Sequence, residues 1–325
     1  MYSRWLLGIA TLVLLQESAS KAYSDSPSLY YSATVGGVKS IYRSTLDGLN
    51  ATVVLTGATG PFDIDDRTGT IYFEAPSSRT PSTESIWKSN IDGSNRVEFI
   101  LNCCLPSRIE IDESNNRLFL AYFRGSEWNL SAPAYIDLGF RTAVEIEFDQ
   151  IHQTAFLAVG RYAGTGLTDE VYARTDDGVV TPIVTGIRNI NGLGIDPVHQ
   201  FVYFSAQPID GSDPRAIYRV RMDGASMERF IDLSDLPGIS IPSDIEVVPE
   251  FNAIFWRDDG LGGLWRSDLD GSNIVKLNNS FSSAGQIKVV VPESRSIELA
   301  VCFGIATAVQ CRRYRRKSTS GKPGQ

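Results

Sequence analysis

Cysteine and histidine are scarce in this sequence of 325 residues, which contains 4 of the first and 2 of the second. No cysteine–histidine spacing typical of a metal site occurs, and there is no Gly-x-Ser-x-Gly elbow or phosphate-binding loop. His152 and His199 occupy matching places in "DQIHQTAF" and "DPVHQFVY", which indicates a role in turns rather than in acid–base catalysis. The sequence therefore predicts no catalytic residue.

Basic residues are also in deficit. The formal net charge is −8, and the last 15 residues contribute +6, so the remainder carries −14. A nucleic-acid partner requires a basic face that neutralises phosphates, and this deficit excludes it. Residues 314–325 are predicted to form a basic, flexible tail.

Long hydrophobic runs are absent. Residues 5–15 form an apolar run that follows Arg4 and precedes the small residues Ser18 and Ser20, which is the layout of a secretory signal peptide over residues 1–20. The run is shorter than the roughly 20 residues that cross a bilayer. Three glycosylation sequons agree with export, and they begin at Asn50, Asn129 and Asn278. We therefore predict a secreted, extracellular protein.

The C-terminal region has a second apolar run, residues 297–309, but it contains Glu298. No stable membrane span is predicted, because the run is short and a central carboxylate opposes insertion. Residues 292–313 are expected to form an extension with two strands joined as a hairpin.

The four cysteines allow three pairings. In an oxidising compartment we favour a Cys302–Cys311 disulfide within the extension. The competing connectivity links both Cys103 and Cys104 to those two cysteines, and the sequence excludes none of the three.

What the sequence does contain is a repeat. "SNIDGSNRVEFI" and "SDLDGSNIVKLN" are nearly the same phrase, and an Asp-Gly pair of this kind recurs between short apolar runs. The aspartates, with one decayed copy at position 137, are 45, 45, 40, 46 and 47 residues apart. Asp-Gly between two apolar runs predicts a β-hairpin. The complete copies begin at Asp47, Asp92, Asp177, Asp223 and Asp270.

Two more short strands precede each hairpin, as in "SRIEID" and "RLFLA". Four strands in about 45 residues without helical periodicity predict one propeller blade. Six such units lie in residues 26–291, so we predict an all-β, six-bladed β-propeller. Its first blade takes strands from both ends of the domain, "SLYYS" and "QIKVVV".

These repeats resemble the class B repeats of low-density-lipoprotein-receptor-like proteins, whose six-bladed propellers are named for a Tyr-Trp-Thr-Asp motif. The best matches are "IDGSNRVEFI", "LDGSNIVKL" and "INGLGIDPVHQFVYF". The Tyr-Trp-Thr-Asp motif itself is incomplete in every blade. The resemblance covers residues 28–291. In the third blade the spacing predicts a short or missing outer strand.

The innermost strands of the predicted propeller alternate carboxylates with aliphatic residues, which leaves two interpretations open. Asp65, Asp112, Asp149 and Asp196 recur at one position of the blade, which indicates a turn-building role. Non-recurrent oxygens could instead hold Ca²⁺ in the central channel, as in six-bladed lactonases and arylesterases. That alternative, a calcium-dependent hydrolase, would use Glu145, Glu147, Asn189 and Asn191.

The favoured function is a non-enzymatic binding module without a cofactor. Loops between the second and third strands of each blade are long and varied, and they mix aromatic, basic and acidic residues as interfaces do. We predict that the protein is a monomer and that these loops form a rim through which it binds an extracellular protein or matrix component. The predicted rim residues are Glu74, Arg124, Trp128, Tyr162, Asp210, Arg257 and Asp258.

Overall fold

The computed structural model describes residues 26–101, 105–121, 124–130, 135–141, 143–160, 168–207, 216–234, 236, 241–278 and 284–291. Two compact units divide the chain, Met1–Val290 and Val291–Gln325. Every described strand lies in the first unit, together with one 3-10 turn, Pro249–Phe251. No helix among these residues has the length and apolar character needed to span a membrane. The predicted signal peptide, C-terminal extension and tail, and all four cysteines, lie outside the described residues.

Four of the five sheets are antiparallel and have four strands each. The first sheet consists, in order, of β23 (Ala284–Val290), β1 (Ser28–Val35), β2 (Val38–Ser44) and β3 (Thr52–Thr56). The second consists of β4 (Phe62–Asp65), β5 (Thr70–Pro76), β6 (Glu84–Asn90) and β7 (Val97–Ile100). The third consists of β8 (Arg108–Asp112), β9 (Arg117–Ala121), β10 (Arg124–Asn129) and β11 (Tyr135–Arg141). The fourth consists of β19 (Pro242–Val248), β20 (Ala253–Asp258), β21 (Leu264–Asp268) and β22 (Val275–Asn278).

The fifth sheet has seven strands, because one long strand serves two meanders. Its order is β12 (Ala143–Asp149), β13 (Thr154–Val159), β14 (Asp169–Thr175), β15 (Val180–Asp196), β16 (Phe201–Gln207), β17 (Ala216–Arg221) and β18 (Glu228–Asp232). The sequence predicts separate strands at "VTPIV" and "NGLGID", whereas β15 runs through both. Gly186 (φ +78°) and Asn189 (φ +53°) bend β15, so its first part pairs with β14 and its second part with β16.

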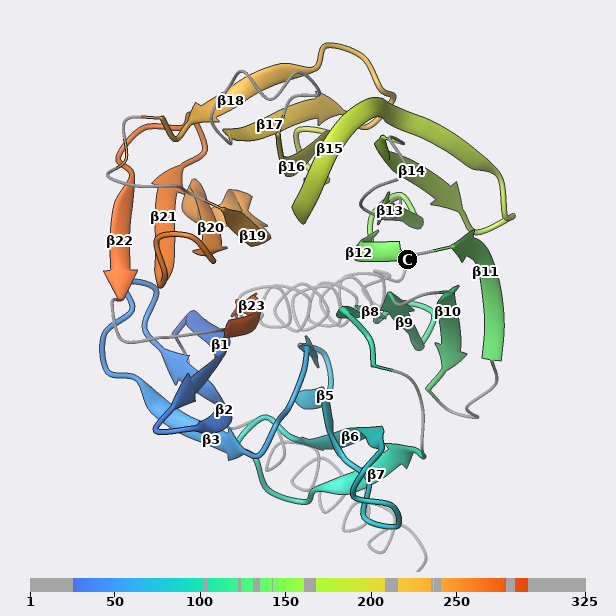
Figure 1. Cartoon of the computed structure of the whole chain (residues 1–325), viewed down its shortest axis with the longest axis vertical. Helices are drawn as coiled ribbons and strands as arrows, with labels where there is room; N and C mark the ends of the chain where they lie inside the picture. Colours follow the sequence, from blue (N-terminus) through green and yellow to red (C-terminus); the bar gives the residue numbers. More distant parts are fainter. Residues whose placement is uncertain are drawn as a thin grey trace, which may run out of the picture. The chain divides into compact units, whose positions relative to one another are not determined.

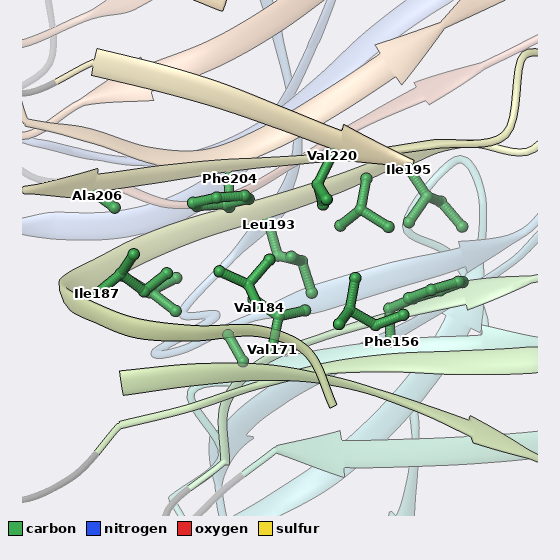
Figure 2. Packing of buried hydrophobic residues seen from close by; sticks show 13 residues of the cluster. Phe156, Val171, Val184, Ile187, Leu193, Ile195, Phe204, Ala206 and Val220 are labelled. Carbon is green, nitrogen blue, oxygen red and sulfur yellow. The ribbon is translucent and has the colours of Figure 1, made fainter. Parts of the chain in front are cut away.

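The bend in β15 closes over an apolar cluster of buried residues. Val184 and Leu193 come from the two arms of the strand, and their side chains lie between those arms (Figure 2). Phe156 and Phe204 complete the packing from β13 and β16 and are almost fully buried. Burial of such apolar surface is the main stabilising term of the fold.

Six strands contact one another in cyclic order, and we call them the inner strands: β4, β8, β12, β15, β19 and β23. Each contacts the next, and β23 contacts β4. Figure 1 shows β8, β12, β19 and β23 innermost, with β3, β7, β11, β18 and β22 at the outer ends of their sheets. Strand β23 also pairs with β1, with Ser28 opposite Val290 and Tyr30 opposite Lys288. Strands from both ends of the described chain therefore share one sheet.

The Asp-Gly hairpins are confirmed. Gly93 and Gly271 take φ of +82° between paired strands, a conformation that glycine adopts without a steric penalty. Asp92 Oδ1 accepts the Ser94 N–H at 2.9 Å, and Asp270 Oδ1 repeats this bond with Ser272 N–H at 2.9 Å. The repeated phrase therefore encodes a repeated turn.

The prediction for the third sheet is wrong. Residues 124–131 were expected in a loop and the outer strand to be short or missing, but β10 covers residues 124–129 and β11 is a full outer strand. The reason lies at Asp137, whose next residue is Leu138 rather than glycine. Without a residue suited to positive φ, the chain stays extended through this decayed copy.

Candidate functional site at the inner strands

Ionisable side chains gather on the inner strands, because alternate residues of a strand point to the same face. Arg108 and Glu110 follow this spacing on β8, as do Gln286 and Lys288 on β23. Eight of these residues form what we call the inner-strand charge cluster. Its members are Asp63, Arg108, Glu110, Glu145, Glu147, Asp244, Glu246 and Lys288.

Arg108 is the central cation of the cluster and is only 1% exposed. Its guanidinium forms ion pairs with Glu147 of β12 and Asp244 of β19. A third carboxylate, Glu145, places Oε2 at 3.7 Å from Arg108 Nε. One side chain of β8 thereby joins two other inner strands, and removing a partner from a buried set of this kind is strongly destabilising.

Lys288 makes the second junction. Its Nζ lies 3.2 Å from Asp63 Oδ1 of β4 and 3.9 Å from Glu110 Oε1 of β8. Gln286, two residues earlier on β23, donates from Nε2 to the Ile109 carbonyl at 2.8 Å. Strand β23 is therefore tied by polar side chains to two other inner strands.

The carboxylates also accept backbone N–H groups of neighbouring strands. Asp63 Oδ2 accepts from Ile111 N–H at 2.8 Å, and Glu246 Oε1 accepts from Val289 N–H at 3.2 Å. Asp244 accepts in the same way from Ile287 N–H. Hydrogen bonds satisfy buried charges that would otherwise oppose folding. These oxygens therefore link β4 to β8 and β19 to β23.

Burial dominates the electrostatics of the glutamates. It raises the pKa of Glu145 to about 7 and that of Glu147 to about 8, against the lowering effect of Arg108. Burial also raises the pKa of Glu110 well above its usual range, partly offset by Lys288. For Lys288 burial acts in the opposite direction, but Asp63 and the neighbouring glutamates outweigh it and raise its pKa. The buried surroundings thus favour the protonated forms of Glu110, Glu145 and Glu147 and the charged form of Lys288.

Of the four residues proposed for a calcium site, the structure engages two with a cation. Glu145 and Glu147 face Arg108. Asn189 is exposed, and Asn191 Nδ2 donates to the Asn189 carbonyl at 2.9 Å. Across the described parts of the chain, no group of three or more His, Cys, Asp or Glu residues is arranged to hold a metal ion.

The turn-building role of the recurrent aspartates is confirmed. Asp149 Oδ1 accepts the N–H groups of Ile151 (2.8 Å) and His152 (2.9 Å), and Asp196 Oδ1 accepts from His199 N–H at 2.9 Å. In both turns the histidine Nδ1 lies 2.7 Å from aspartate Oδ2. Asp65 and Asp112 accept N–H groups in the same manner. Both histidines therefore belong to turns.

Three predicted rim residues, Glu74, Arg257 and Asp258, are buried or half-buried near the ends of β5 and β20. Glu74 on β5 is 4% exposed and Asp258 is 1% exposed. Asp258 Oδ1 accepts N–H groups of Ile241 (3.0 Å), Gly260 (2.9 Å) and Leu261 (2.7 Å), so it supports the loop after β20. Arg257 pairs with the exposed Asp259 at 2.7 Å.

The remaining predicted rim residues divide into two sets. Arg124 and Trp128 lie on β10 rather than in a loop, and Trp128 packs against the apolar cluster that contains Leu130. Tyr162 and Asp210 lie outside the described residues. Among the sequons, Asn50 is exposed in the turn before β3. Binding by these residues, and glycosylation, stay predictions.

Sequence reasoning missed both cations of the cluster. Arg108 precedes Glu110 by two residues, and Lys288 follows Gln286 by two, so the alternation that identified the carboxylates also contained them. Their ion-pair partners lie far away in the chain, however, and this pairing is visible only in the folded protein.

No protein-family model matches the chain, and no curated protein matches its sequence. Solved structures do match. A chain from the crystal structure of a nidogen/laminin complex has a TM-score of 0.66 at 13% identity, covering 82% of this chain and 100% of that one. The β-propeller domain of the trilobed protease from Pyrococcus furiosus has a TM-score of 0.52 at 13% identity, covering 78% and 82%. The described part of the present chain is therefore a β-propeller.

TolB from Acinetobacter baumannii matches the propeller equally well, with a TM-score of 0.65 at 10% identity over 85% of this chain and 70% of that one. These identities are low, so the similarity concerns the fold. The cyclic contacts of the inner strands and the four-stranded meanders agree with that fold.

Proposed function

We propose that this protein is a secreted, non-enzymatic binding module that contacts an extracellular protein or matrix component through one rim of a six-bladed propeller. The observation that carries the proposal is the use of the inner-strand carboxylates. They are engaged by Arg108, by Lys288 and by backbone N–H groups, which supports a structural role for the ring and leaves the loops for function.

The six-bladed arrangement is supported by dividing the seven-stranded sheet at the bend of β15. Its first part completes the blade of β12, β13 and β14, and its second part opens the blade of β16, β17 and β18. The blade that contains β1 and β23 would then close the ring, since its strands come from both ends of the domain. Such closure protects strand edges from pairing with other chains.

The proposed rim is the edge of the propeller opposite the Asp-Gly hairpins. Strands alternate in direction, so the loops after β5 and β20 emerge at the edge away from the turns after β4 and β6. Arg79 in the loop after β5 is exposed, and Asp259 after β20 has a 44% exposed side chain. A chain within a nidogen/laminin complex shares the fold, which supports a protein partner for a module that we propose to be monomeric.

The alternative function, a calcium-dependent lactonase or arylesterase, is favoured by one observation. The cluster contains six carboxyl groups and only two cations, and Glu110 Oε2 has no hydrogen-bond partner among the described residues. A hard cation would complement such oxygens. The position of Arg108 among these carboxylates favours the binding module instead.

Charge reversal on the rim tests the proposal. The purified protein is immobilised, partners are captured from extracellular extract and identified, and their affinities are measured for Arg79→Glu, Asp259→Lys and Arg67→Glu. Arg67 is 48% exposed in the turn after β4 and is the matched control at the other edge. We expect tenfold or greater loss for the two rim variants, given about 1.4 kcal/mol per tenfold, and none for the control. Equal effects at both edges would contradict the rim assignment.

A further inference from the structure

The inner-strand charge cluster has more acids than cations can neutralise. Asp63, Glu110, Glu145, Glu147, Asp244 and Glu246 share the two cations of the cluster, Arg108 and Lys288. Outside the cluster, Arg257 also acts on Glu145, but it pairs with Asp259. If all six carboxyls were ionised, the cluster would carry four uncompensated negative charges in a buried position. Isolated buried charges are avoided in folded proteins, because the group takes up a proton instead.

The neighbouring elements do not remove this excess. Arg117 of β9 pairs with Asp112 and Asp176, and Arg257 of β20 pairs with Asp259. Strand β5 adds Glu74, and the turns after β4 and β8 add the further acids Asp66 and Glu113. Lys39 of β2 donates to the Thr59 carbonyl. Strand β13 has no charged residue, and β15 adds the exposed Arg188 and the turn residue Asp196.

We propose that the inner strands form an acid-stabilised lock: Glu145 and Glu147 hold protons in the folded protein at mildly acidic pH, and their ionisation at alkaline pH adds buried negative charge that Arg108 and Lys288 do not balance, which lowers the stability of the propeller. The contacts of Arg108 place these groups at the junction of β8, β12 and β19. Glu110 Oε2, buried without a hydrogen-bond partner among the described residues, adds a third group that is better accommodated with a proton. The propeller is accordingly suited to a mildly acidic environment.

The direction of the pH dependence follows from linkage. Burial raises the pKa of Glu145 to about 7 and of Glu147 to about 8 in the folded chain, whereas an unfolded glutamate titrates near about 4.3. Between those values the folded state binds more protons than the unfolded state, so stability falls as pH rises. This contribution is complete below about pH 4.3 and is lost as pH rises through 7 to 8. Ordinary acid denaturation has the opposite sign.

Urea unfolding between pH 5.5 and 8.5 tests the lock. The unfolding equilibrium constant of the wild-type protein should fall by tenfold or more on going from pH 8 to pH 5.5, since either glutamate alone would supply more than that factor. Glu147→Gln and Glu145→Gln replace the neutral carboxyl by a neutral amide and should each flatten the dependence. Glu228→Gln is the matched control, because Glu228 is 53% exposed and pairs with Arg219 at the surface.

The lock is overturned if wild-type stability is constant or rises toward pH 8. It is overturned equally if both amide variants keep the wild-type pH dependence.

Infrared spectroscopy provides a readout that does not require the variants to fold. The folded wild-type protein at pH 6 should show the carbonyl band of protonated carboxyl groups, and this band should decrease as pH rises to 8.5. Absence of the band at pH 6 would refute the proposal.

Discussion

Replacing the central guanidinium is the sharpest perturbation of the propeller. Arg108→Met places a side chain of similar length, but apolar, at a position that is only 1% exposed. It removes the positive charge that Glu145, Glu147 and Asp244 share. Breaking a buried ion pair by removing one partner costs about 3–5 kcal/mol. We therefore expect the free energy of unfolding to fall by about that amount at pH 8, where Glu145 is ionised and Glu147 is partly ionised.

At pH 6 the loss in Arg108→Met should be smaller. The pKa of Glu145 is raised to about 7 and that of Glu147 to about 8, so both are mostly neutral in the folded state at pH 6. The remaining cost then comes from the roughly 1–3 kcal/mol of lost hydrogen bonds and from Asp244, which loses its ion-pair partner in this variant. Urea denaturation followed by tryptophan fluorescence measures both values. The control is Arg229→Met, whose partner Asp232 is 51% exposed and which should cost less than about 1 kcal/mol.

A loss below about 1 kcal/mol for Arg108→Met at both pH values would refute the structural role of the cluster, since it would match the exposed pair. A larger loss at pH 6 than at pH 8 would refute the assigned protonation states.

Two further substitutions test the turns and the core. Gly93→Ala should lower the free energy of unfolding by about 2–5 kcal/mol, because a Cβ there would lie 2.1 Å from the Val54 carbonyl oxygen in addition to the strain of φ +82°. Gly178→Ala, with φ +85° and open space around it, should lower it by only about 1–2 kcal/mol. Equal melting temperatures for the two variants would contradict this comparison. Leu193→Ala should lower the free energy of unfolding by about 2–5 kcal/mol, because it leaves a cavity in the cluster around β15, where Leu193 is fully buried. Val198→Ala, at a 59% exposed position, should change stability by less than about 0.5 kcal/mol. Calorimetric unfolding that ranks the two variants the other way would contradict the burial of Leu193.

The features predicted from sequence are those with local causes. An Asp-Gly pair forms its turn through bonds within three residues, as Asp92 and Ser94 show, so the hairpins and their spacing could be read directly. The recurrent aspartates such as Asp149 were predictable for the same reason. Alternation along a strand also identified the acidic residues of the inner strands.

The features that were missed depend on distant partners or on a lost glycine. Arg108 meets Asp244 across more than a hundred residues of chain, and no local pattern announces that contact. The continuity of β15 depends on bends at Gly186 and Asn189 that keep both flanking pairings. In the third sheet, β11 stays extended through Asp137 because glycine does not follow it.

Calcium titration tests most directly whether the inner-strand carboxylates are structural. Isothermal calorimetry of the purified protein with Ca²⁺ is combined with a screen of lactone and aryl-ester substrates. We expect no saturable heat, no Ca²⁺-dependent change in melting temperature and no turnover, because Arg108 and Lys288 lie among these carboxylates and would repel a further cation. Stoichiometric Ca²⁺ binding that disappears in Glu145→Ala or Asn191→Ala, together with substrate turnover, would contradict it and establish the hydrolase instead.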